Sequence, residues 1–522
     1  MTFLHTRAFR RITSARGAYT LVEILVSTTL SLIMLAGVAV VFGTVGDSIA
    51  NSRAALEMVD RLRSAQQRLA RDLEGVTVRT TLSRGPQYRP KSENEEGYFE
   101  YGEGTGTLTG VNSGRDGNPT DTTVGDFDDV LMFTTQSVDR PFVGKFDSET
   151  YQSKYAEVCW FVRGRTLYRR QLLIAPEVRS DMDSDADGSL TSSGDWSGDS
   201  VYHRYDISVR PQSYASGETY WEPNSLGDLT KRENRFAHRL HATDSYPYNA
   251  GRWGQLRLPT LGECSHDDWM TWTSAANAPS VTAASESDFW TNPHPWASTV
   301  VDFATGNLVD YHPGPRFGED IILSNVIGFD VKVWDAGAPI VDVWDNNATP
   351  GDVSDDKRIA ALFPADTSYI SKLGSVSTTG PSDPIYYRVS SYGAFVDLGY
   401  APGYSPVASV PQPRFHLRNY DPATNVAGGR SDLRQIYDTW SLHYENNGSR
   451  EVGNTETASL PVDAGTNGFD DDGNGIVDDA DEMETAPPYP IPLRGIQVKI
   501  RVFEPGSRQI REVTVVQEFT TK

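Results

Sequence analysis

Cysteine is nearly absent from this sequence, and positive charge is scarce. Only Cys159 and Cys264 occur among 522 residues, so the chain can form one intramolecular disulfide at most. Such a bond is allowed outside the cytoplasm, but Cys159 stands in an apolar, strand-like stretch where a buried thiol is the equal alternative. The 70 Asp and Glu residues outnumber the 47 Lys and Arg residues, which gives a formal net charge of −23. A chain this acidic, without basic stretches, is not expected to bind nucleic acid.

Recognisable catalytic motifs are also missing. The sequence has no HExxH, GxSxG or CxxC motif and no glycine-rich phosphate loop. His238 and His241 are three residues apart, but no ordered carboxylate motif accompanies them. We therefore expect that the protein is not an enzyme.

The most informative feature is one long stretch without charge near the N-terminus. Ile24–Gly46 contains no charged residue, and as a helix it would be about 35 Å long, enough to cross a bilayer. Glu23 lies at the head of this stretch, where a carboxylate is costly in lipid and therefore indicates a function. The preceding leader has no acidic residue and carries four basic ones, which predicts a cytoplasmic N-terminus: Arg7, Arg10, Arg11 and Arg16.

The sequence Tyr19-Thr20-Leu21-Val22-Glu23 resembles the start of a mature type IV pilin or pseudopilin. In that family a prepilin peptidase removes a basic leader and the new N-terminal residue is N-methylated. The resemblance implies cleavage between Ala18 and Tyr19, methylation of Tyr19 and an assembly role for Glu23. The family usually has Gly directly before the cut, whereas Gly17 is one position earlier here, so cleavage after Gly17 is the alternative. An uncleaved signal anchor is the other interpretation of the same stretch.

The pattern after the apolar stretch predicts an α+β fold. Apolar residues at three-, four- and seven-residue spacing continue the helix, so that residues 20–74 form one helix ending at Gly75. β-branched and aromatic stretches follow, including a hairpin that turns at Arg163-Gly164 and another at the C-terminus. These stretches predict an antiparallel sheet behind the long helix: Asp129–Thr135, Glu157–Ile174, Ile321–Trp334, Tyr386–Leu398 and Ile496–Phe519.

Three segments resemble the J-type minor pseudopilin of type II secretion, and more closely the large relatives of planctomycete-type bacteria. They are RLRSAQQRLARDLE (61–74), VCWFVRGRTLYRR (158–170) and LRGIQVKIRVFEPGSRQIREVTV (493–515). The resemblance implies a single-pass inner-membrane protein with a periplasmic domain, whose partners are other pseudopilin or pilin subunits and the prepilin peptidase. It implies the following organisation: a leader at 1–18, a transmembrane helix at 19–46, its periplasmic half at 47–79, and a pilin-like domain at 80–522 with loop-rich insertions at 175–315 and 340–490.

Two acidic segments predict calcium binding. Residues 467–482 place oxygen ligands at alternating positions before a glycine, as an EF-hand-type loop does, although the closing bidentate glutamate is replaced by an aspartate. The candidate ligands there are Asp470, Asp472, Asn474, the Ile476 carbonyl, Asp478 and Asp481. A second segment has a similar opening but no proper closing carboxylate, and its candidates are Asp183, Asp185 and Asp187. A solvated acidic loop is the alternative for both.

Two functions of different kinds follow. The first is a filament subunit of a type II secretion pseudopilus or a type IV pilus. The second is a calcium-stabilised adhesin or glycan-binding module, carried on a pilin-like anchor and built from the insertions.

Overall fold

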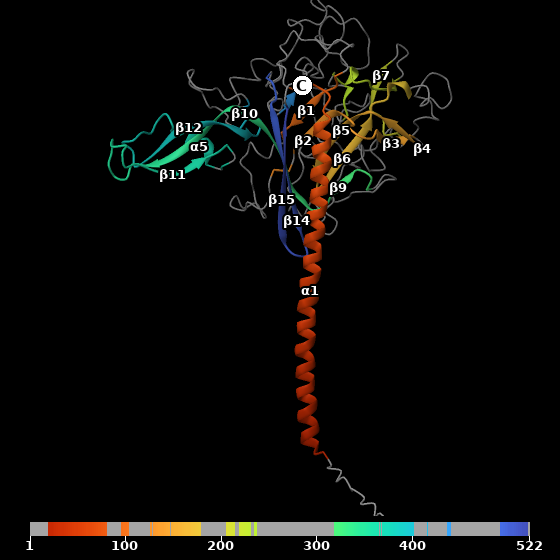
Figure 1. Cartoon of the computed structure of the whole chain (residues 1–522), viewed down its shortest axis with the longest axis vertical. Helices are drawn as coiled ribbons and strands as arrows, with labels where there is room; N and C mark the ends of the chain where they lie inside the picture. Colours follow the sequence, from red (N-terminus) through yellow and green to blue (C-terminus); the bar gives the residue numbers. More distant parts are fainter. Residues whose placement is uncertain are drawn as a thin grey trace, which may run out of the picture. The chain divides into compact units, whose positions relative to one another are not determined.

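The computed structural model (Figure 1) describes residues 19–80, 96–103, 126–127, 129–146, 148–178, 205–213, 219–230, 234–236, 318–364, 366, 368–400, 415, 436–439 and 491–519. The chain divides into two compact units. One comprises Met1–Met58 with Glu504–Arg508, and the other comprises Val59–Phe503 with Gln509–Lys522.

The first described element is helix α1, Leu21–Glu74, which runs from one unit into the other. Its N-terminal part contains an 18-residue stretch that is apolar and long enough to cross a membrane, and none of that stretch is buried. The helix ends at Glu74, directly before Gly75, as predicted. A Cβ at Gly75 would lie 2.3 Å from the Gln136 carbonyl oxygen, so the close approach of residues 135–136 requires glycine there.

The part of α1 in the second unit is amphipathic. Leu62, Ala65, Leu69 and Leu73 are buried there, at the spacing of one helix face. Leu56, which the apolar pattern places on the same face, lies in the first unit and is 67% exposed. The buried face therefore begins later than the pattern alone indicates.

A six-stranded antiparallel sheet forms the first layer of the second unit, in the order β13-β1-β2-β5-β6-β9. Its strands are β1 (Phe99–Gly102), β2 (Val130–Gln136), β5 (Tyr155–Arg163), β6 (Thr166–Leu173), β9 (Ile321–Leu323) and β13 (Ile436–Asp438). Almost every residue of β1, β2, β5 and β6 is buried, so both faces of these strands are covered. The β5–β6 hairpin turns at Gly164, whose φ of +60° suits glycine.

A second antiparallel sheet has the order β11-β10-β14-β15, and β12 also pairs with β10. Its strands are β10 (Val326–Asp345), β11 (Lys357–Leu362), β12 (Ile385–Val396), β14 (Gly495–Glu504) and β15 (Gln509–Glu518). The first part of β10 pairs with β14, and its second part pairs with β11 and β12. Gln66 of α1 donates a hydrogen bond to the Thr514 carbonyl of β15 at 2.9 Å, which joins the helix to this sheet.

The remaining elements are small. Hairpins are formed by β3 (Phe142–Phe146) with β4 (Glu149–Ser153), and by β7 (Val209–Ser213) with β8 (Thr219–Pro223). The short helices are η2 (Pro176–Val178), η3 (Asp228–Thr230) and α5 (Tyr369–Ser375).

The predicted α+β fold, a long N-terminal helix packed against antiparallel sheets, is confirmed. The predicted strand Tyr386–Leu398, which lies within the segment 340–490, is observed as β12 (Ile385–Val396). The beginning of the segment 340–490 contains regular structure, because β10 continues to Asp345 and β11, α5 and β12 follow. β12 extends the sheet to which β14 and β15 belong. The predicted stretch Ile321–Trp334 covers β9 and only the first part of β10.

Candidate functional site

The residues to which the family resemblance assigns cleavage, methylation and assembly lie at and just before the start of α1. Tyr19 is 81% exposed, and Gly17 and Ala18 lie outside the described residues. Thr20 and Glu23 form a reciprocal capping pair: the Thr20 backbone N–H donates to Glu23 Oε2 at 2.9 Å, and the Glu23 N–H donates to Thr20 Oγ1 at 3.2 Å. Glu23 therefore has a local structural role, since a Thr-x-x-Glu capping box satisfies two helix N–H groups. The motif was present in the sequence and was missed there.

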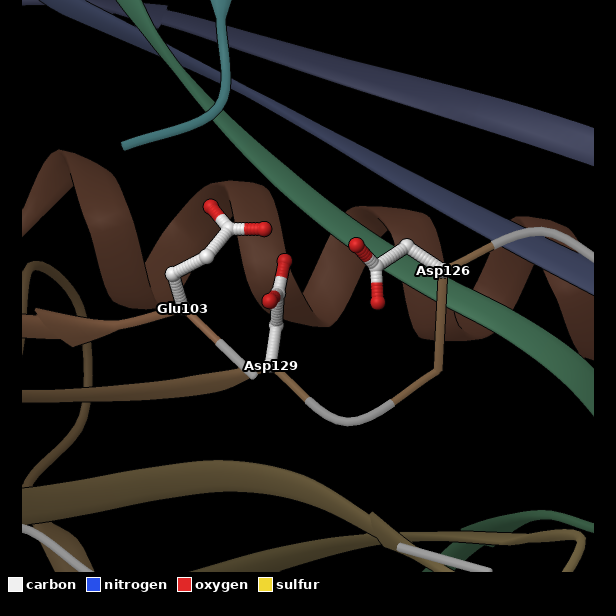
Figure 2. Close-up of side chains that lie close together, drawn as sticks. All are labelled: Glu103, Asp126 and Asp129. Carbon is white, nitrogen blue, oxygen red and sulfur yellow. The ribbon is translucent and has the colours of Figure 1, made fainter. Parts of the chain in front are cut away.

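A second candidate site is a group of three carboxylates, Glu103, Asp126 and Asp129, which lies in the second unit (Figure 2). Glu103 follows β1 directly and Asp129 precedes β2 directly. Because Gly102 pairs with Val130 in the antiparallel register, the strand ends bring these two side chains together. Figure 2 shows Asp129 between Glu103 and Asp126. One oxygen atom from each carboxylate lies within 4.8 Å of the others.

Backbone N–H groups fix the orientation of this acidic group. The Val331 N–H of β10 donates to Asp129 Oδ2 at 2.6 Å, and the Leu398 N–H donates to Glu103 Oε2 at 3.1 Å. The Tyr101 hydroxyl also contacts Glu103 Oε2 and the Val331 carbonyl. Burial first, and then the negative charges of Asp129 and Glu103, raise the pKa of Tyr101 well above its ordinary value.

The acidic group can hold a metal ion. Asp129 is fully buried and Glu103 is only 6% exposed, and like charges this close together repel one another strongly in a site of low dielectric constant. A divalent cation or bound protons would relieve that repulsion, and carboxylate oxygens are ligands of hard cations. No local sequence pattern indicates this group, because Glu103 and Asp126 are far apart in the chain and the β1–β2 pairing brings them together.

A buried ion pair attaches α1 to the first sheet. Arg169 of β6 donates two hydrogen bonds to Asp72, from Nε to Oδ2 at 2.7 Å and from Nη2 to Oδ1 at 2.8 Å. The Trp160 indole of β5 also donates to Asp72 Oδ2, at 3.0 Å. The side chains of Arg169 and Asp72 are 3% and 6% exposed. A bidentate pair of this kind sets the helix in one rotational position on the sheet.

A second buried network holds the segment 234–236 on the edge of the same sheet. Arg235 lies 2.6 Å from Glu100 of β1 and 2.7 Å from Asp438 of β13, and all three side chains are fully buried. Its guanidinium also lies 4.1 Å from the centre of the Tyr98 ring. Burial by itself would lower the pKa of Arg235, but the charges of Asp438 and Glu100 outweigh it and raise the pKa. This part of the first predicted insertion is therefore packed on the core.

Several predicted site residues fall outside the described part of the chain. These are both calcium segments, with Asp470, Asp472, Asn474, Ile476, Asp478 and Asp481 in one and Asp183, Asp185 and Asp187 in the other. Cys264 is also outside, while Cys159 is buried in β5, so the predicted alternatives of a disulfide and a buried thiol both stand.

Comparisons with known proteins identify no relative. No protein-family model matches the chain, and neither a curated protein nor a solved structure matches it. The resemblance to pilins therefore rests on the residues of the chain itself.

Proposed function

We propose that the chain is a membrane-anchored, leader-processed subunit of the pseudopilin or pilin type. One observation carries the proposal. A single helix of 54 residues begins two residues after Tyr19, exposes its apolar N-terminal half, and buries one face of its C-terminal half beside antiparallel strands. An apolar surface of that length requires lipid or other apolar helices around it. A minor subunit of a type II secretion pseudopilus fits best, because the large acidic domain would crowd a filament shaft.

Assembly in this proposal brings apolar helices of several subunits together. Cleavage after Ala18 would create a new amine at Tyr19, and in a filament that amine can pair with Glu23 of a neighbouring subunit. Pairing offsets the cost of placing both charges in an apolar environment. The partners are other subunits of the same class, the prepilin peptidase and the inner membrane. The domain after α1 is then periplasmic.

The processing step makes a first prediction. Mass spectrometry of the chain extracted from membranes should find a mature N-terminus at methylated Tyr19. Deleting the peptidase should leave the leader in place, with Met1 or its processed form at the terminus. A mature chain that begins near residue 40 would mean secretory cleavage and would rule out this function.

A second candidate function, a calcium-stabilised adhesin or glycan-binding module, is supported by the acidic group. Glu103, Asp126 and Asp129 provide three carboxylates in the folded domain, and the segment 470–481 provides an EF-hand-like spacing. Calcium is the expected ion, since it accepts irregular oxygen coordination, whereas magnesium requires a tight octahedron. In this function the pilin-like helix serves only as the anchor.

Calcium binding makes a second prediction. Calcium should raise the melting temperature of the detergent-extracted chain more than magnesium does, with a dissociation constant of about 10⁻⁴–10⁻³ M, typical of extracellular sites. At a calcium concentration ten times the dissociation constant, the free energy of unfolding should rise by about 1.4 kcal/mol. Asp470→Ala with Asp472→Ala should remove the response if the predicted loop binds, and Asp126→Asn should remove it if the acidic group binds.

Asp126 is the suitable substitution in the acidic group because Glu103 and Asp129 accept backbone hydrogen bonds and their loss would disturb the fold. Equal responses to calcium and magnesium would indicate screening by the net negative charge and would contradict a specific site.

A further inference from the structure

Lys332 is a buried lysine that the proposed function does not use. It lies in the first part of β10, opposite Gln497 of β14, and its side chain is 8% exposed. Val333 of β10 pairs with Val396 of β12, so Asp397, which follows β12, lies across from Lys332. The Lys332 amine contacts Asp397 Oδ1 directly. A second carboxylate, Asp330, lies two residues earlier on the same face of β10, and its Oδ1 is 3.0 Å from the Lys332 Nζ.

The geometry points to an intramolecular amide bond between Lys332 Nζ and Asp397 Cγ, formed by the folded chain itself. The inference does not depend on the proposed function. An amine, a carboxyl group and a second carboxylate within contact distance are the groups that a condensation requires. Their fixed positions replace a bimolecular encounter, and well-oriented groups reach effective concentrations of about 10⁵–10⁸ M.

The reaction needs no external reagent. The Lys332 ammonium transfers a proton to the Asp397 carboxylate, which leaves a neutral amine beside a neutral acid. Nζ then attacks Cγ, and Asp330 accepts a proton from the nitrogen and returns it to the departing hydroxyl. The C–N bond forms, one C–O bond breaks, and one water molecule leaves. Asp330 is therefore a catalytic residue in this step, since it touches the reacting amine.

The surroundings favour the amide. Condensation converts two charges in a poorly solvated site into one neutral group, which removes the cost of keeping them away from water. Burial raises the pKa of Asp397 above its ordinary value, although the Lys332 charge opposes this. Burial by itself would lower the pKa of Lys332, but the charges of Asp397 and Asp330 raise it well above its ordinary value, so the reaction starts from the ion pair. The product would close a covalent loop from 332 to 397 that encloses β11, α5 and β12.

Tryptic digestion of the full-length, detergent-extracted chain tests the inference at the peptide level, where leader processing has no effect. An amide at Lys332 prevents cleavage there, so peptide 317–357 should appear joined to peptide 389–414. Its mass should be lower than the sum of the two peptides by one water molecule. Fragmentation should place the branch at Lys332 and Asp397. Two separate linear peptides, one ending at Lys332 and the other beginning at Val389, would show an ordinary ion pair. Their presence without a branched species would overturn the inference.

Variants test the roles of Lys332 and Asp330 separately. Lys332→Arg keeps the positive charge but should abolish the branched peptide, whereas Lys499→Arg, a change 3.7 Å from Asp330, should retain it. Asp330→Asn should lower the branched fraction at least about tenfold, because it removes the proton acceptor. An unchanged fraction in Asp330→Asn would overturn the role of Asp330. The wild-type digest decides the bond itself, even if a variant fails to fold.

Discussion

Replacing Asp72 by alanine is expected to detach the C-terminal half of α1 from the first sheet. The substitution leaves the Arg169 guanidinium buried without its bidentate partner and the Trp160 indole without its acceptor. Removal of one partner from a buried ion pair costs about 3–5 kcal/mol. Amide hydrogen exchange over residues 59–74 should therefore be faster by two or three orders of magnitude at least, following about 1.4 kcal/mol per tenfold.

An exposed ion pair at a similar distance provides the control. Arg501 and Glu512 lie 2.8 Å apart, but their side chains are 28% and 36% exposed. Glu512→Ala should change stability by about 1 kcal/mol or less, because water screens such a pair. The double variant Asp72→Leu with Arg169→Met should recover much of the lost protection, since an apolar pair leaves no buried charge. Equal effects of Asp72→Ala and Glu512→Ala would mean that the buried pair does not hold the helix.

The regular elements of the fold were predictable because their signals are local. The helix predicted over residues 20–74 is observed at Leu21–Glu74, since apolar periodicity and the Gly75 stop are both read along the chain. The β5–β6 and β14–β15 hairpins were predictable for the same reason, because β-branched and aromatic residues flank a short turn.

The buried ion pairs were not predictable from the sequence, because they join residues that are distant in the chain. Asp72 and Arg169 are 97 positions apart, and only the packing of α1 on β6 brings them together. Lys332 and Asp397 meet only through the β10–β12 register. Nothing in the local sequence of Asp330 or Lys332 distinguishes them from a solvated charge pair on a strand.

The head of α1 shows that one residue can fit two explanations. The family resemblance selects Glu23 for assembly, whereas the hydrogen bonds with Thr20 make it part of a capping box. Both explanations follow from its position, because the start of an apolar helix needs a cap and a filament needs a buried countercharge. The two roles require different properties of the side chain, an acceptor oxygen for the cap and a negative charge for assembly.

Glu23→Gln separates the two roles and should strongly impair assembly. Glutamine retains the acceptor oxygen of a capping box but removes the charge that would pair with the amine of a neighbouring Tyr19. Close charge pairs at interfaces contribute about 2–5 kcal/mol, so incorporation into filaments should fall at least about tenfold. Membrane insertion and leader cleavage should persist, because the apolar stretch is unchanged. Cross-linking and co-purification with partner subunits measure incorporation, and N-terminal mass spectrometry measures cleavage.

Glu23→Ala and Glu57→Gln complete the comparison. Glu23→Ala removes both the charge and the cap. If assembly depends on the charge, the assembly defects of Glu23→Ala and Glu23→Gln should be equal. Glu57 is an exposed acid of the same helix beyond the apolar stretch, and Arg61 stands four residues after it. An i,i+4 pair of this kind is worth only about 0.2–0.5 kcal/mol, so Glu57→Gln should assemble normally. If Glu23→Gln assembles like the unmodified chain while Glu23→Ala does not, the carboxylate acts only as a helix cap. Assembly would then have to rest on the packing of apolar helices alone.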